Sequence, residues 1–423
     1  MRHFKMNIGF SYRALVLCYL VLFNSCLEEI DFETDNFESL LVVDATITNE
    51  LKTQEITLSR TFEFGEDNDN IESGAQVKVV GDGVEYIFQH TETGKYQSIQ
   101  PFNAQPNVVY HLEITTADGE RYSSSEMKLT TATQIDNLYA ERITNDDGVD
   151  GVAIKVDSFD PTNTANFYRY TFEETYKIVA PMWRQEDLYL DTYILDSIPV
   201  CVVKIRQRPE EQKACYKTEF SNKIKITLTS GLNEDLVEGY LVNFLPSDDF
   251  KISHRYSALV KQFVISEEAF NYLETIQSFT SQGSLFSQVQ TGFVMGNISS
   301  TVNPNKKVIG IFDVSSVTTQ RLFFNFIDFY PNTNLPPFIT SCDLRAPDVA
   351  QLFQDGDEEI FICSSQLNFI TNRIRVYLEE YTGDPPFYVG PADPPLGPWL
   401  MVPRACGDCT ALGEPEPPSF WVE

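Results

Sequence analysis

Short apolar runs that alternate with polar residues, separated by turn residues, most constrain the fold of this chain. Residues 74–80 alternate with a period of two, residues 81–83 (Gly-Asp-Gly) form a turn signal, and residues 84–89 return as the second arm. This pattern predicts a β-hairpin. Similar runs lie at residues 40–47, 54–64, 94–96, 108–114 and 121–128. About seven short strands at this spacing predict a mainly β fold that begins with an immunoglobulin-like or transthyretin-like sandwich.

The following part of the chain predicts a larger β-rich domain with one amphipathic helix. The helix is expected over residues 266–281, because Ser266 is a suitable N-cap and Phe270, Leu273 and Ile276 recur at helical spacing. Gly283 is expected to end it. Strands are predicted at residues 151–159, 165–172, 221–230, 256–264, 292–300, 307–314 and 321–329, around Phe361, and at residues 373–381.

These patterns predict five segments. They are a leader at residues 1–25, an acidic tether at 26–39, a β-sandwich domain at 40–132, the larger β-rich domain at 133–384, and a proline-rich strap with a CxxC pair at 385–423. The proline content of the last segment favours an extended strap over the surface rather than a third core.

The first 26 residues predict export. A basic start precedes an apolar run at residues 14–23, which is too short to span about 30 Å of hydrocarbon as a helix. Ser25 and Cys26 follow, as at the cleavage site of a bacterial lipoprotein, although Phe23 stands where leucine is usual. We therefore expect Cys26 to become the acylated first residue of an outer-membrane lipoprotein. An ordinary secretory signal followed by an unrelated cysteine is the alternative.

Charge excludes two classes of function. The chain has 423 residues, 61 of them acidic and 31 basic, and a formal net charge of −30. Nucleic-acid binding needs a basic face, so we expect no nucleic-acid partner. Adsorption to anionic lipid through surface charge is excluded for the same reason.

Six cysteines follow Cys26, namely Cys201, Cys215, Cys342, Cys363, Cys406 and Cys409. An even number of cysteines in an exported chain predicts disulfides. Local spacing favours Cys201 with Cys215 and Cys342 with Cys363. We expect Cys406 and Cys409 to close a small structural loop, because zinc binding would require a second such pair or nearby histidines.

No enzyme motif of good specificity is found. Gly-x-Ser-x-Gly and His-Glu-x-x-His are absent, and the Ser-x-x-Lys match at residues 125–128 lies on a predicted strand. We therefore expect no catalytic residues and no resident cofactor. The acidic loops at residues 66–70 and 146–151 make calcium the one cation to consider, with solvated turns as the alternative.

Four aromatic residues are candidates for contact with a sugar or peptide ligand: Trp183, Phe387, Tyr388 and Trp399. Packing within the protein is the alternative for each of them. Trp399 and Trp421 lie in the proline-rich tail, where they are expected to anchor it.

A set of short motifs resembles the domain-of-unknown-function 4249 family of Bacteroidetes lipoproteins. The motifs follow the family's order over almost all of the processed chain, at residues 41–44, 57–61, 74–77, 255–270, 283–286, 296–298, 308–312, 406–410 and 418–421. Residues 287–290 depart from the family, which more often has an Asp-Pro turn there. The acidic residues after Cys26 also resemble the surface-export signal of such lipoproteins, although a solvated tether is an equal alternative.

This resemblance implies a lipoprotein of the outer membrane, facing either the cell surface or the periplasm, that is often encoded beside a TonB-dependent receptor. It implies no reaction and supplies no catalytic residues. We therefore expect a lipid-anchored, non-catalytic binding or accessory component of a TonB-dependent transporter. A surface hydrolase of glycan or peptide and a structural or adhesive surface protein are the two alternatives.

Overall fold

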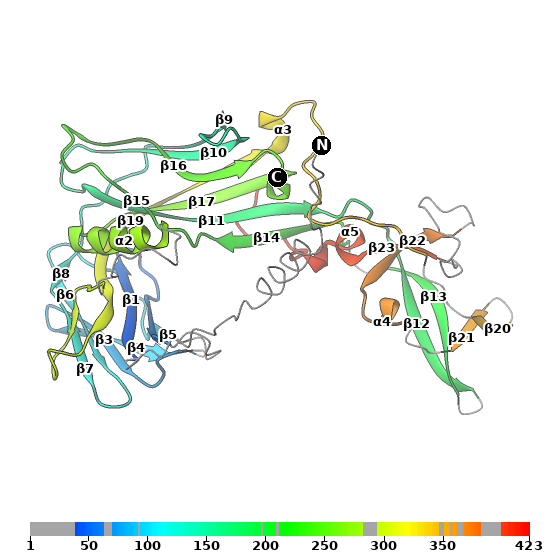
Figure 1. Ribbon diagram of the computed structural model, residues 1–423, viewed down its shortest axis with the longest axis horizontal. Helices are drawn as coiled ribbons and strands as arrows, with labels where there is room; N and C mark the ends of the chain where they lie inside the picture. The colour runs from blue at the N-terminus through cyan, green and yellow to red at the C-terminus, as the bar shows by residue number, and fades with distance from the viewer. Residues whose placement is uncertain are drawn as a thin grey trace, which may run out of the picture.

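The computed structural model describes residues 39–62, 70–91, 94–195, 198–208, 211–281, 294–346, 351–355, 358–362, 367–381 and 399–423. About half of the chain is strand and one helix is long, so the predicted mainly β class is confirmed. Figure 1 shows three parts: a curled sheet with a first core, a sandwich with a second core, and a smaller sheet that projects from the sandwich. Within the described part of the chain, none of the helices has the length and apolar character that crossing a bilayer requires.

The first core lies inside strands from the N-terminal part of the chain. They are β1 (Leu41–Thr48), β2 (Glu55–Arg60), β3 (Gln76–Gly81), β4 (Val84–His90), β5 (Lys95–Ser98), β6 (Val109–Thr115), β7 (Arg121–Ser124) and β8 (Met127–Lys128), with β18 (Ile298–Ser300) added later. Alternate residues of these strands, such as Tyr110, Leu112 and Ile114, are buried in one core, as the period of two predicts. The predicted hairpin turn is also present, since Asp82 and Gly83 have positive φ between β3 and β4.

The second core lies between two sheets. One sheet contains β9 (Asn137–Thr144), β10 (Asp150–Asp160) and β16 (Asp235–Pro246). The layer facing it contains β11 (Phe167–Val179), β14 (Ala214–Phe220), β15 (Lys225–Leu228), β17 (Arg255–Val264) and β19 (Val308–Asn325), with the short helices η1 (Phe250–Ile252) and α3 (Phe326–Phe329) nearby. Buried tyrosines, among them Tyr168, Tyr170 and Tyr256, fill the space between the layers.

Helix α2 (Glu267–Ser281) confirms the predicted helix. The Ser266 hydroxyl accepts a hydrogen bond from the backbone N–H of Ala269 at 3.1 Å, which is the expected N-cap. Phe270 is buried, and Leu273 and Ile276 pack beside it against strands of the sandwich layer. Gly283, the predicted helix end, lies outside the described residues.

Strand β19 belongs to both cores. Its first eight residues pair in parallel with β1, and its last ten pair antiparallel with β17. The prediction of two separate strands, at residues 307–314 and 321–329, is therefore wrong. The polar residues between them stay extended because Ser315 pairs with β1 and residues 316–320 pair with β17. Residues 326–329 turn into α3, where the Asp328 carboxylate accepts the backbone N–H of Asn325 at 2.7 Å.

Two of the family-like motifs meet at this strand. Gly310 has a φ of +135°, and a Cβ there would lie 2.0 Å from the carbonyl oxygen of Val43 on β1. The Asn297 side chain donates to the carbonyl oxygen of Phe312 at 2.8 Å, and its own oxygen accepts the N–H of Phe312 at 2.9 Å. The Asn297 side chain thus forms with β19 the backbone hydrogen bonds that a neighbouring strand would form. Gly310, which has no Cβ, allows β1 to approach β19 closely.

The projecting sheet is inserted between two neighbouring strands of the sandwich. Strand β11 continues into β12 (Glu186–Leu195) and β13 (Ile198–Gln207), and the chain returns in β14, which pairs with β11. Strands β20 (Gln351–Asp355) and β21 (Glu358–Ile362) complete the projecting sheet in the order β12–β13–β21–β20. At its base lie α4 (Asn368–Thr371), β22 (Arg375–Glu380), β23 (Trp399–Pro403), α5 (Arg404–Gly407) and η3 (Cys409–Ala411).

The first prediction concerns the close approach of β1 and β19. Gly310→Ala is expected to lower the free energy of unfolding by roughly 3 kcal/mol, because the new methyl group meets the Val43 carbonyl at an unfavourable φ. Gly119→Ala is the matched control, since Gly119 also has a positive φ of +86° but has open space around it. It is expected to cost about 1 kcal/mol. Urea unfolding measures both, and equal losses would contradict the assignment.

Candidate functional site

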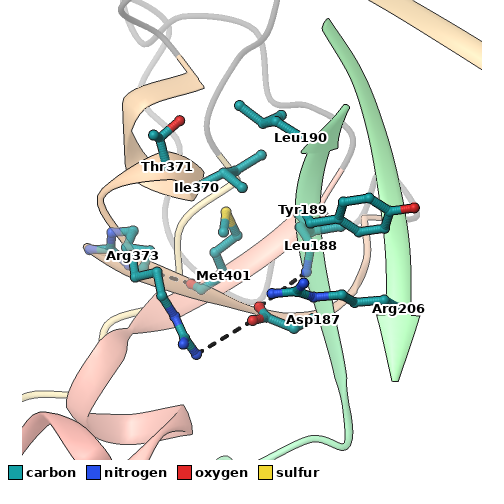
Figure 2. Close-up of a pocket in the computed structure, with 10 residues that line it drawn as sticks. Asp187, Leu188, Tyr189, Leu190, Arg206, Ile370, Thr371, Arg373 and Met401 are labelled. Carbon is teal, nitrogen blue, oxygen red and sulfur yellow. Dashed lines mark hydrogen bonds and ion pairs between the residues drawn. The ribbon is translucent and has the colours of Figure 1, made fainter. Parts of the chain in front are cut away.

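A cavity of about 240 Å³ lies where the projecting sheet meets its base. Figure 2 shows that β12 contributes one wall and that the segment around α4 and β22 contributes the other. The lining residues are Asp187, Leu188, Tyr189, Leu190, Arg206, Ile370, Thr371, Arg373, Arg375 and Met401. The cavity therefore joins parts of the chain that lie almost 200 residues apart, and only the folded protein forms it.

Charged residues gather on one side of the cavity and continue into the protein behind it. The Arg373 guanidinium lies 2.8 Å from the fully buried carboxylate of Asp408 and 3.5 Å from that of Asp187. Arg404 also contacts Asp408, at 3.4 Å. Arg208, whose side chain is only 3% exposed, lies 3.9 Å from Asp187. Burying these charges is costly, and removing one partner would leave the others without a counter-charge. The network therefore stabilises the base only when all of its members are present.

Arg208 is incompletely satisfied. One of its terminal N–H groups donates to the carbonyl oxygen of Gly407 at 2.9 Å, but its Nε and Nη2 atoms have no hydrogen-bond partner in the described part of the chain. Burial lowers the pKa of this guanidinium, because desolvation disfavours its charge. The Nε atom of Arg373 is buried without a partner as well. The base of the cavity therefore has more donors than its own acceptors satisfy.

Arg373 is held in an uncommon backbone conformation. Its φ is +49°, in the left-handed region, directly after the short helix α4. Glycine or asparagine usually occupies such a position, since a larger residue there costs about 1 kcal/mol or more. The backbone thus places an arginine at the cavity at some expense in stability, which is a feature of many binding sites.

The two cysteines of the CxxC motif link this base covalently to other parts of the chain. Cys406 bonds to Cys342, and Cys409 bonds to Cys215 on strand β14. The predicted pairs Cys201–Cys215 and Cys342–Cys363 are therefore wrong, and so is the expected loop between Cys406 and Cys409. Cys201 is disulfide-bonded too, whereas Cys363 lies outside the described residues.

Local spacing failed because the tail folds back onto strands that come much earlier in the sequence. The Cys215–Cys409 bond joins residues 194 positions apart, and the Cys342–Cys406 bond joins residues 64 positions apart. The two bonds flank Asp408, so they fix its carboxylate opposite Arg373. No signal in the sequence, apart from the even cysteine count, indicated this arrangement.

Residues 399–411 differ from the predicted extended strap. Leu400, Met401 and Val402 of β23 are almost fully buried and pack with β22, because they form an apolar run that the proline content of the segment obscured. Residues 412–423 do run along the surface of the sandwich. There Glu414 and Tyr216 pair through their backbones in an isolated β-bridge, and the centres of the Trp421 and Tyr216 rings lie 4.9 Å apart.

Two of the four aromatic ligand candidates, Trp183 and Trp399, lie in the described part of the chain, and they pack in different cores. Trp399 is 7% exposed and packs in the small core beside the cavity, so its ring faces protein. Trp183 is half-buried against the second core, and its indole N–H has no partner in the described part of the chain. Phe387 and Tyr388 lie outside the described residues. Cys26 and the loop at residues 66–69 also lie outside them.

The other acidic loop considered for calcium is a turn between β9 and β10. Asn145 organises it by accepting the backbone N–H groups of Asp147 and Val149, and Asp150 forms two hydrogen bonds to Arg142 at 2.9 and 3.0 Å. Among the described residues, no group of three or more His, Cys, Asp or Glu side chains is placed to hold a metal ion.

A second cavity, of about 330 Å³, is lined by two glutamates, Glu174 and Glu219, which we consider as a candidate pair for glycoside hydrolysis. Glu174 and Glu219 both contact the Lys251 ammonium, at 2.6 and 2.7 Å, and Tyr256 donates to Glu174 at 2.6 Å. Partial burial opposes the charge on Glu219, but hydrogen bonds from Lys217 and Lys251 outweigh it and lower its pKa to about 2. A general acid needs a raised pKa, so this cluster is organised as an ion-pair network.

A family model described as a domain of unknown function, DUF4249, matches residues 27–321. The chain belongs to this family. The match includes Asn297, Gly310 on β19 and the whole of the β12–β13 hairpin, while the CxxC motif lies beyond the matched residues. No curated protein matches the chain.

The second prediction tests the ion-pair network at the base of the cavity. Asp408→Asn is expected to lower the free energy of unfolding by about 3 kcal/mol, because Arg373 and Arg404 would lose a buried counter-charge. Asp191→Asn is the matched control. Asp191 pairs with Lys204 on the exposed surface, so its loss is expected to cost less than about 1 kcal/mol. Thermal unfolding followed by circular dichroism compares the two, and a stable Asp408→Asn protein would contradict the network.

Proposed function

We propose that this protein is a lipid-anchored, non-catalytic binding component of the bacterial envelope that works with a TonB-dependent transporter. The observation that carries the proposal is the arginine-lined cavity at the base of the projecting sheet (Figure 2). Ligand cavities commonly combine an apolar wall with a few fixed polar groups, and this one does so. The DUF4249 match is consistent with the proposal but assigns no function.

The residues around the cavity favour binding over chemistry. Among the described residues that line it, none is a serine, cysteine or histidine. Its carboxylate, on Asp187, accepts the backbone N–H of Leu188 at 3.0 Å and faces two arginines. A general base hydrogen-bonded to a nucleophile is the usual arrangement for hydrolysis. Thr371 and Tyr189 carry the hydroxyl groups of the described lining residues, and the contacts of Asp187 are to Leu188 and the two arginines instead.

The projecting sheet offers a means of contact with a partner protein. Strand β12 is at an edge of this sheet, so one side of its backbone is available for pairing with another strand. Ile194 on the same strand is 77% exposed, which is unusual for so apolar a residue. In this proposal the projecting sheet docks on the transporter, and the acylated Cys26 keeps the protein on the membrane.

The third prediction concerns the lipid anchor. Labelled palmitate is expected to enter the wild-type protein, and Cys26→Ser is expected to abolish both labelling and recovery in the membrane fraction. Cys18→Ser is the control, because Cys18 lies within the predicted leader and is removed with it. An unlabelled wild-type protein that retains its leader would refute the anchor.

The fourth prediction concerns the partner. A photo-crosslinking residue at position 194 is expected to capture a large outer-membrane protein in native membranes, identified by mass spectrometry as a TonB-dependent receptor. The same residue at position 232 is the control, since Leu232 is 61% exposed but belongs to the sandwich. Equal yields at both positions, or none at position 194, would count against docking through the projecting sheet.

A further inference from the structure

We infer that the cavity at the base of the projecting sheet binds a carboxylate group that carries a short apolar chain. This inference deepens the proposed function, because it names the class of ligand that the cavity would take. It rests on the charge, the shape and the fixed geometry of the residues that line the cavity.

Positive charge at the cavity is the first observation. Among the described residues that line it, three are arginines, Arg206, Arg373 and Arg375, and one is acidic, Asp187. The chain as a whole has a net charge of −30, so a local excess of arginine is unexpected. Burial and the nearby charge of Arg345 lower the pKa of Arg375, which an anion in the cavity would reverse. Carboxylates and phosphates both match the planar fork of a guanidinium, so the charge calls for an anion of one of these two kinds.

The donors are only loosely engaged on the cavity side. Arg373 contacts Asp408 at 2.8 Å, a normal distance for a charged hydrogen bond, but lies 3.5 Å from Asp187 on the cavity wall. Its side chain is 35% exposed and lines the cavity, so part of the guanidinium can be reached from there. Arg373 is thus fixed from behind by Asp408, and a ligand carboxylate can form hydrogen bonds that Asp187 does not.

The opposite wall is apolar. Leu188, Leu190, Ile370 and Met401 line it, and Figure 2 shows Leu190 and Ile370 on one side of the cavity and Asp187, Arg206 and Arg373 on the other. Inorganic phosphate or sulfate would contact only the charged side. A molecule with a carboxylate at one end and a few CH₂ groups at the other would contact both.

The arginines are held in place before any ligand binds. Arg375 donates to the backbone carbonyl of Asp343 at 2.8 Å, Arg206 stacks over the Tyr189 ring at 5.3 Å, and the left-handed backbone of Arg373 sets its direction. Rigid donors lose little conformational entropy on binding, so a small ligand can be bound with useful affinity.

Isothermal titration of the purified full-length protein with acetate, butanoate and hexanoate tests the inference. Affinity is expected to rise by up to about fourfold for each added CH₂ group, as burial against the apolar wall requires. Two matched probes each lack one feature: butanol lacks the charge, and inorganic phosphate lacks the apolar chain. Both are expected to bind at least tenfold more weakly than butanoate. Equal binding of butanol and butanoate, or of phosphate and butanoate, would overturn the inference.

Variants locate the binding at this cavity. Arg373→Ala is expected to weaken hexanoate binding at least tenfold, and Arg206→Gln at least threefold. Arg142→Gln is the matched control, because it removes an exposed arginine on β9 that pairs only with Asp150 among the acidic residues described. It is expected to leave the affinity unchanged. An Arg206→Gln protein and an Arg142→Gln protein with the same affinity would overturn the assignment.

Two further measurements keep the test decisive. If Arg373→Ala fails to fold, as circular dichroism would show, Leu190→Asp replaces it, since a carboxylate on the apolar wall is expected to reduce hexanoate binding at least tenfold. The titrations contain no partner protein. A protein that crosslinks through position 194 but binds no carboxylate would therefore overturn this inference and leave the proposed docking intact.

Discussion

The parallel pairing of β1 with the first half of β19 is the interaction on which the rest of the structure depends. The same strand continues into an antiparallel pairing with β17, so its backbone hydrogen bonds serve both cores. Such a ladder requires that β1 approach closely, and Gly310 provides the necessary space. Asn297 then satisfies the free backbone groups of Phe312 on the other side. The curled sheet and the sandwich are consequently parts of one hydrogen-bonded framework.

This framework positions the candidate site indirectly. Strands β11 and β14 are neighbours in the framework, and the projecting hairpin is the connection between them. The later segment that completes the base is brought there by two disulfides, one of which ends on β14 itself. Disulfides that close long loops remove much of the entropy of the unfolded chain. They therefore stabilise an assembly whose apolar core is small.

The charged network beneath the cavity stabilises that base only at a large cost in desolvation free energy. In the described part of the chain, Arg208, Arg373 and Arg404 pair with two buried carboxylates, those of Asp187 and Asp408. Apolar residues of similar volume are often as stabilising as a buried ion pair, so stability alone does not explain the cluster. Arg373 joins this network to the cavity, where its side chain is 35% exposed, and an anion in the cavity would give it a further counter-charge, which is why we regard the network as part of a binding site rather than as packing.

Sequence by itself determined the local structure of this protein. The alternation in β3, β4 and β6, the Asp82–Gly83 turn, the Ser266 cap and the mainly β class were predictable, because side-chain periodicity and turn chemistry act between residues close in sequence. Tertiary structure alone decided the union of two predicted strands into β19, the cysteine pairing and the position of the arginines. Asp187, Arg373 and Asp408 each look like solvated surface residues in the sequence. They meet only because chain segments far apart fold against one another, and pairing over such distances leaves no local pattern to read.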